Sequence, residues 1–264
     1  MKAPVLTCAA AALCFFSFSE ASAQSSTTTT RIPTYIGTLS SESGSTFGNF
    51  RTVDLNSADT NAPTVVGNTF LTDNWCAGSI YIAPNQLLET PKFKYDIENN
   101  QILLNTSTKK PKPDQADNPE DLRVINGVQV LAFEINDPVQ GKRGFVSSIN
   151  SGYTLQGAPA PGFLEVLADG NMYLYRKVET SLLKANYNIA LNAGEKRDRI
   201  VKREVYFLRK DGSKELIPVS RNKKETLAAF DKQAQVEKFA TDNKVKFNNA
   251  DDLTQLVTYY NSLQ

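Results

Sequence analysis

Histidine is absent from this sequence of 264 residues, and that absence excludes more chemistry than any other feature. Without imidazole the chain cannot build a Ser-His-Asp or Cys-His catalytic centre, a His-ligated zinc site or an imidazole pH switch. Cysteine is nearly as scarce. Cys8 and Cys14 fall in a segment that we expect to be removed, which leaves Cys76 alone. One cysteine excludes an intrachain disulfide, a cysteine-rich zinc site and an iron–sulfur cluster.

Charge of one sign and long apolar runs are also lacking. The 29 basic residues are balanced by 28 acidic ones, so the overall charge gives no support for binding to nucleic acid. Beyond the first residues, no apolar run approaches the ~20 residues that a transmembrane helix needs. We therefore expect no nucleic-acid partner, no transmembrane span, no cofactor and no metal.

The first 23 residues have the pattern of a secretory signal peptide. Lys2 supplies the positive charge, residues 5–18 are apolar, and Ala21-Ser22-Ala23 is a cleavage site of the A-x-A type. We expect a mature chain that begins at Gln24, opens with a polar tether over residues 24–30, and is exported as a soluble periplasmic or extracellular protein. A membrane anchor is the alternative, and the short apolar run disfavours it.

Residues 31–219 are expected to form a β domain. A short strand is predicted near residues 35–39, and four predicted hairpins follow without helices between them. Asn126-Gly127 suits a type I′ turn, which requires positive φ angles. Consecutive hairpins predict a mainly β fold whose antiparallel sheet is rolled or barrel-like. The hairpins pair residues 93–97 with 101–105, 122–125 with 128–135, 163–168 with 172–178, and 202–209 with 214–219.

The last segment, residues 220–264, has a helical period and predicts a small helical appendage packed on the sheet. Its clearest helix follows Asn249, a plausible N-cap, and carries apolar residues at the spacing of one helix face. Residues 205–208 are apolar in succession, which fits a strand covered on both faces by the sheet core and by these helices. The apolar helix face consists of Leu253, Leu256, Val257, Tyr260 and Leu263.

Several short motifs occur together from about Gly67 to the C-terminus. The ensemble resembles a family of uncharacterised secreted proteins abundant in Bacteroidetes. Because the family is uncharacterised, the resemblance gives no activity that can be carried over to this chain. One departure is the turn Glu98-Asn99-Asn100, which lacks the glycine often found in tight hairpins. The motifs are Gly67-Asn68-Thr69-Phe70, Trp75-x-x-Gly78-x-Ile80, Lys94-Tyr95-Asp96, Asn99-Asn100-Gln101, Gly162-Phe163-x-Glu165-Val166-Leu167, Asn186-Tyr187-Asn188, Asp252-Leu253 and Tyr259-Tyr260-Asn261-Ser262-Leu263.

Paired carboxylates are the catalytic option that remains for a chain without histidine. A glycosidase needs two of them facing one sugar, ~5–10 Å apart. Glu165 is the best single candidate, because it shares a strand face with Phe163 and Leu167 and burial there would raise its pKa. Glu134 is the second candidate. The alternative is that each carboxylate faces solvent or a basic side chain, and we name no catalytic residue.

Two further patterns are ambiguous. Asp54-x-Asn56-x-x-Asp59-x-Asn61 offers oxygen ligands for calcium, but it lacks the EF-hand glycine and terminal glutamate, so a polar turn is the simpler interpretation. Five tyrosines on predicted strands either line a groove for a ligand or fill the sheet core. They are Tyr81, Tyr95, Tyr173, Tyr175 and Tyr206, of which Tyr173 and Tyr175 join Glu165 as candidate ligand-binding residues.

The stretch from Lys196 to Lys224 contains eleven basic and four acidic residues. Such a stretch is suited to an anionic surface partner, such as lipid headgroups or a polysaccharide. The alternative is an exposed sheet edge protected by lysine. For the whole chain we expect an exported, non-enzymatic envelope protein that binds a ligand or a protein partner. The alternatives are a structural subunit of a surface complex docked by the C-terminal helices, and a carboxylate-based glycan hydrolase.

Overall fold

A computed structural model describes residues 65–83, 86–108, 117–188 and 191–263. The expected leader, tether and first strand lie outside these residues, and so does the segment from Asp54 to Asn61 that was weighed as a calcium loop. The described fold is mainly β, with 45% strand and 18% helix. Its strands are β1 (Cys76–Ala83), β2 (Gln86–Asp96), β3 (Gln101–Asn105), β4 (Leu122–Asn126), β5 (Ala132–Asp137), β6 (Gly141–Ser147), β7 (Thr154–Leu155), β8 (Ala158–Pro159), β9 (Phe163–Ala168), β10 (Met172–Leu183), β11 (Arg199–Lys210) and β12 (Glu215–Pro218).

All of these strands belong to one sheet in the order β4-β3-β2-β1-β5-β6-β9-β10-β11-β12-β7-β8. The pairings are antiparallel except that of β12 with β7. The sheet curls, because the ring of Tyr95 in β2 lies 5.1 Å from that of Phe163 in β9, although three strands separate them in the sheet order. It does not close, however, and ends at β4 and β8 in the described part of the chain. The expectation of a barrel is therefore wrong.

Three of the four expected hairpins are present, and the glycine-free turn has a simple explanation. Asn100 adopts a φ of 48°, a left-handed conformation that asparagine tolerates better than most residues. The carboxylate of Asp96 accepts hydrogen bonds from the backbone N–H groups of Glu98 and Asn99 and holds the turn between β2 and β3. Asparagine and a capping aspartate thus replace the expected glycine.

The hairpin predicted around Asn126-Gly127 is wrong. A 3-10 turn, η2 (Gly127–Gln129), follows β4, and β5 pairs with β1 and β6 instead of β4. The side chain of Asn126 caps this turn by accepting a hydrogen bond from the N–H of Val128. A Cβ on Gly127 would lie 2.5 Å from the carbonyl oxygen of Asn100. Close backbone approach, and not a positive φ, therefore explains the glycine. A second 3-10 turn, η1 (Pro119–Asp121), precedes β4.

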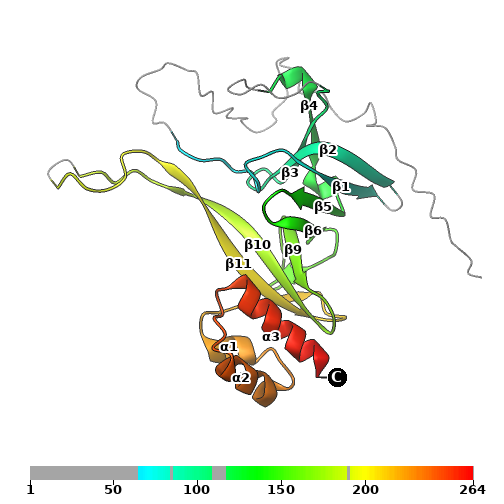
Figure 1. Cartoon of the computed structure of the whole chain (residues 1–264), viewed down its shortest axis with the longest axis vertical. Helices are drawn as coiled ribbons and strands as arrows, with labels where there is room; N and C mark the ends of the chain where they lie inside the picture. The colour runs from blue at the N-terminus through cyan, green and yellow to red at the C-terminus, as the bar shows by residue number, and fades with distance from the viewer. Residues whose placement is uncertain (1–64, 84–85, 109–116, 189–190, 264) are drawn as a thin grey trace, which may run out of the picture.

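Three helices, α1 (Lys223–Leu227), α2 (Gln233–Asp242) and α3 (Ala250–Ser262), cover one face of the sheet at its lower end in Figure 1. The side chain of Asn249 caps α3 by accepting a hydrogen bond from the N–H of Asp252, as predicted. Helix α3 lies against β9 and β10. None of the helices in the described residues is long and apolar enough to cross a membrane.

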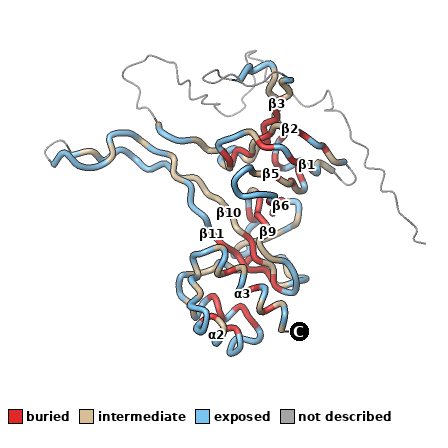
Figure 2. Tube along the Cα trace, in the orientation of Figure 1, coloured by how far each residue is buried: buried red, intermediate tan, exposed pale blue. Residues whose placement is uncertain are grey.

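The buried hydrophobic residues form three clusters; buried positions are red in Figure 2. The upper core contains aromatic residues from the curled strands, including Phe93, Phe133 and Phe145. The lower core joins Leu174 and Leu208 of the sheet to the apolar face of α3. The third core lies on the other face of β10 and β11, around Tyr175 and Phe207. Residues 206–208 are thus buried on both faces of β11, as the succession of apolar residues predicted.

Candidate functional site

Glu165 lies at the centre of an ionic cluster, which we define as Asp137, Arg143, Glu165, Arg176 and Glu204, and in which Arg143 and Glu165 are buried. Arg143 donates to Glu165 through Nε at 2.8 Å and Nη2 at 2.7 Å. Arg176 donates to the same carboxylate through Nε at 2.8 Å and Nη2 at 2.9 Å. Further out, Asp137 lies 3.7 Å from Arg143 and Glu204 lies 3.0 Å from Arg176. Two bidentate arginines thus occupy both oxygens of Glu165.

The position of the cluster follows from the pleat of the sheet. Phe163, Glu165 and Leu167 alternate onto one face of β9. Phe163 belongs to the upper core and Leu167 packs against the lower core. Glu165 between them pairs laterally with Phe145 of β6 and Arg176 of β10. The ionic cluster therefore separates two apolar cores on the same face.

This arrangement shifts the pKa of Glu165 in the direction opposite to the one expected from the sequence. Burial alone would raise its pKa, but hydrogen bonds and opposite charges from Arg143 and Arg176 hold the pKa below its ordinary value. A carboxylate that stays ionised and has no free oxygen is unsuited to donate a proton to a leaving group. The expected raised pKa is wrong because the sequence did not indicate which basic residues face Glu165.

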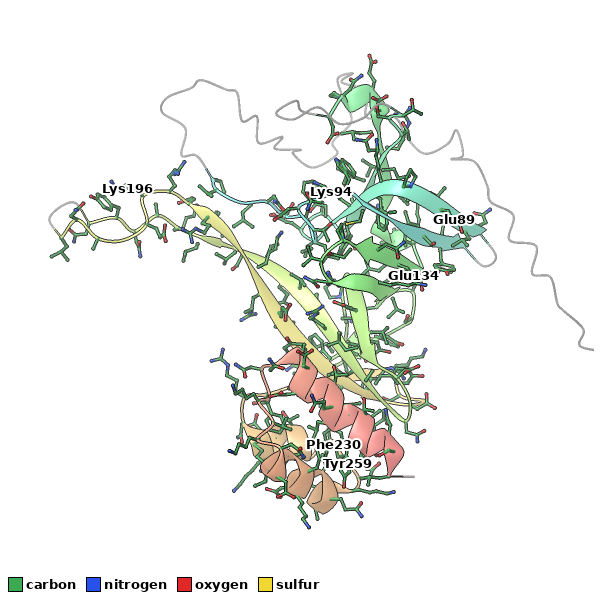
Figure 3. The ribbon with its side chains drawn as sticks, viewed as in Figure 1. Glu89, Lys94, Glu134, Lys196, Phe230 and Tyr259 are labelled. Carbon is green, nitrogen blue, oxygen red and sulfur yellow. The ribbon has the colours of Figure 1, made fainter. Side chains whose placement is uncertain are left out.

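Glu134 is not brought to Glu165. Phe133, next to Glu134, lies directly across from Phe145, which in turn lies across from Glu165. Directly paired residues share a face and successive residues alternate, so Glu134 and Glu165 lie on opposite faces of the sheet. Glu134, labelled in Figure 3, pairs with the exposed Lys142 at 2.9 Å. The described residues therefore do not place these two candidates around one sugar.

Tyr173 and Tyr175 face an arginine of their own chain. The guanidinium of Arg209 lies 4.1 Å from the ring centre of Tyr173 and 5.0 Å from that of Tyr153. Its Nε donates to the Tyr175 hydroxyl at 3.3 Å, and burial raises the pKa of that hydroxyl. Arg209 fills the space between these rings. Neither Tyr153 nor Arg209 was identified from sequence, because β10 and β11 are joined by a long connection that gives no local register signal.

Lys94 forms a second cation–aromatic cluster that the sequence did not reveal. Its ammonium lies 5.3 Å from the ring of Phe70 and 5.1 Å from that of Trp75, and burial lowers its pKa. It also donates to the carbonyl of Asp73 at 2.5 Å. The indole N–H of Trp75 donates to Asp117 at 2.9 Å. These contacts fasten residues 70–75 to β2, so the cluster has a structural explanation.

The basic stretch is partly neutralised by ion pairs within the chain. Lys202 lies 3.4 Å from Asp73, Arg203 lies 2.9 Å from Glu179, and Lys210 contacts Asp231 at 2.5 Å. These ion pairs, together with the buried Arg209, reduce the positive charge available to a partner. The anionic partner therefore stays a prediction without a localised patch to support it.

The outer halves of β10 and β11 project from the rest of the described chain as a two-stranded ribbon (Figure 1). We call this ribbon the arm and define it as Val178–Leu183 paired with Arg199–Glu204. Its surface is mainly exposed or half-buried (Figure 2). Leu182 is 46% exposed and Leu183 is 45% exposed, next to each other on opposite faces of the ribbon. Lys196 lies on the segment that connects the two strands (Figure 3).

The two edges of the arm differ. Along β11, the N–H of Val66 donates to the carbonyl of Asp198 and the N–H of Ile200 donates to the carbonyl of Val66, both at 2.8 Å. Along β10, pairing with β9 stops at Arg176. Beyond that residue, no strand in the described part of the chain pairs with the edge of β10 that faces away from β11. The arm thus combines an open strand edge with exposed leucines.

Metal and cysteine chemistry find no support in the parts of the chain that the structure describes, where no group of three or more Cys, Asp or Glu side chains is placed to hold a metal ion. Cys76 is buried, and its Sγ lies 3.6 Å from the hydroxyl of Thr72. Comparison with family models, curated proteins and solved structures finds no match to this chain.

Proposed function

We propose that this chain is an exported, non-enzymatic envelope protein that binds a macromolecular partner through the arm. The observation that carries the proposal is the combination of an open β10 edge with exposed Leu182 and Leu183. A free strand edge offers main-chain hydrogen bonds to another strand, and exposed apolar side chains add contact area. Export is supported by the leader pattern of residues 1–23.

The two alternative functions receive less support. A subunit docked by its C-terminal helices needs an apolar helix face that is available, whereas Leu253, Leu256 and Val257 are fully buried against the chain's own sheet. A glycan hydrolase needs two facing carboxylates, whereas Glu165 is held by two arginines and Glu134 lies on the other face. The arm remains the surface that best fits a binding role.

Site-specific photo-crosslinking in cells that export the protein tests this function. A photoreactive amino acid at Leu182 is expected to give a discrete covalent adduct, with a second copy or with another macromolecule. The same amino acid at Val139, which is 88% exposed in the turn between β5 and β6, is the matched control and is expected to give none. If both positions give the same adducts, or neither gives any, the arm is not the binding surface.

Mass spectrometry of the exported protein tests the compartment. We expect an N-terminus at Gln24, because small residues at positions 21 and 23 suit the signal peptidase. Retention of residues 1–23, or a lipid on Cys8 or Cys14, would contradict export as a free protein.

A further inference from the structure

The open edge of β10 has few of the features that usually prevent strand pairing. Natural edges are protected by prolines, bulges or charged side chains, especially lysine. From Val178 to Leu183 the chain has no proline, and its pairing with β11 has no register shift. Its one charged side chain, Glu179, is already paired with Arg203 at 2.9 Å and with Lys177 at 3.4 Å. Among the described residues this is a regular edge without proline whose one charge is paired, and such an edge is suited to accept another strand.

We propose that the occupant of this edge is β10 of a second copy of the chain, paired antiparallel about a two-fold axis at Thr180. This inference rests on the proposed binding role of the arm and names its partner. A two-fold contact requires a surface that is complementary to itself. The sequence around Thr180 meets that requirement.

The register about Thr180 brings compatible side chains together. Val178 comes to lie opposite Leu182 of the second copy, and Leu182 opposite its Val178, so one apolar pair is made twice. Glu179 comes to lie opposite Ser181 of the second copy and Lys177 opposite its Leu183, so no like charges face each other directly. Apolar cross-strand pairs stabilise a sheet, whereas like charges directly opposite destabilise it.

Pairing of this kind also accounts for the exposure of the arm. A two-stranded ribbon is marginally stable in water, whereas three or more strands with an apolar face are stable. Two copies would form a four-stranded sheet in the order β11-β10-β10-β11, in which the two open β10 edges pair with each other. The other edge of each arm forms an isolated bridge with Val66 at Arg199, whereas the described residues place no partner on the β10 side, so we place the second copy there.

Sedimentation of the purified exported protein over a wide range of concentrations tests the proposal. We expect a reversible monomer–dimer equilibrium. Leu182→Lys places a charge opposite Val178 twice in each dimer, so the dimer Kd should rise by about tenfold or more. Val139→Lys, a charge introduced at a more exposed apolar position outside the arm, should leave the Kd unchanged.

A crosslink gives an independent measurement of register. Thr180→Cys should form an intermolecular disulfide with itself under mild oxidation, because the two copies meet at this residue. Val139→Cys is the control for random collision, and Cys76 contributes little because it is only 2% exposed.

A protein that stays monomeric at all concentrations would overturn the proposal, as would a dimer that Leu182→Lys leaves intact while Thr180→Cys crosslinks no faster than Val139→Cys. If the purified protein is monomeric while Leu182 crosslinks to a different macromolecule in cells, the second copy is wrong and the binding role of the arm stands. If the edge is covered by other residues of the same chain, the protein is monomeric and the inference fails.

Discussion

Asn261, in the last turn of α3, hydrogen-bonds to both backbone groups of Met172, the first residue of β10. Its Oδ1 accepts from the N–H of Met172 and its Nδ2 donates to the carbonyl of Met172, both at 2.9 Å. The same Nδ2 donates to the carbonyl of Asp169 at 2.9 Å. One side-chain amide therefore satisfies the turn between β9 and β10 and ties it to the C-terminal helix.

Asn261→Ala is expected to lower the free energy of unfolding by about 2 kcal/mol, because the backbone groups of Met172 lose their partners at a buried position. Chemical denaturation checks this value. Ser262→Ala, at the exposed neighbouring position of α3, is the control and should change stability by less than about 0.5 kcal/mol. Equal effects of the two substitutions would show that Asn261 does not hold the turn.

The contact between Asn261 and Met172 also illustrates what sequence could and could not predict. Local signals sufficed for the hairpins with short turns, for the Asn249 cap and for the apolar face of α3. They failed where a residue's role depends on a distant part of the chain. Asn261 meets Met172 across 89 residues, and Gly127 is needed because Asn100 lies beside it.

In the candidate site, too, local patterns were predicted correctly and contacts between distant parts of the chain were not. Alternation along β9 correctly placed Glu165 on the inner face with Phe163 and Leu167. It did not reveal that Arg143 and Arg176 lie on that face, because lateral strand order is a non-local property. The pairing of β10 with β11, and so the arm, was missed for the same reason.

Glu165→Gln is expected to lower the free energy of unfolding by about 3–5 kcal/mol at neutral pH, because it removes the buried carboxylate that Arg143 and Arg176 share. Glu134→Gln is the matched control, since its ion pair with Lys142 is solvent-exposed and should contribute about 0–1 kcal/mol. Urea unfolding of both variants measures the difference. Similar losses for the two would contradict a buried ionic cluster.

The pH dependence of the Glu165 contribution has a definite sign. The pKa of Glu165 is lowered in the folded protein, so its stabilising effect is fully present above the unfolded-state pKa of about 4.3. The effect is lost as the pH falls through the lower folded-state pKa. The stability difference between the parent protein and Glu165→Gln should therefore stay constant near neutrality and shrink below about pH 4. A difference that grew with acidity would refute this assignment.

Gly127→Ala and Gly144→Ala should have opposite effects on the free energy of unfolding. A Cβ at Gly127 would lie 2.5 Å from the Asn100 carbonyl oxygen, so the substitution should cost about 1–3 kcal/mol. A Cβ at Gly144, in β6, meets nothing within 4 Å, and alanine there should stabilise by about 0.4–1 kcal/mol through the unfolded chain. Thermal unfolding of the two variants gives the signs, and a tolerated Gly127→Ala would contradict the close approach of Asn100 to Gly127.

Leu256→Ala tests whether α3 belongs to the folded unit or is a detachable docking element. Leu256 is fully buried in the lower core with Leu174 and Leu208 of the sheet. Removing a buried leucine side chain leaves a cavity, so we expect a loss of about 2–5 kcal/mol in the free energy of unfolding. Gln255→Ala, at the exposed neighbouring position of the same helix, should change stability by less than about 0.5 kcal/mol.

The two thermal unfolding curves, together with that of a chain truncated after Asn248, separate the alternatives. If α3 is integral, Leu256→Ala and the truncation both unfold at lower temperature than the parent protein. If both unfold at the parent temperature as monomers, the apolar face of α3 is not packed on its own sheet. That face would then be available to a partner, and assembly through the C-terminal helices would displace the arm as the best-supported binding surface.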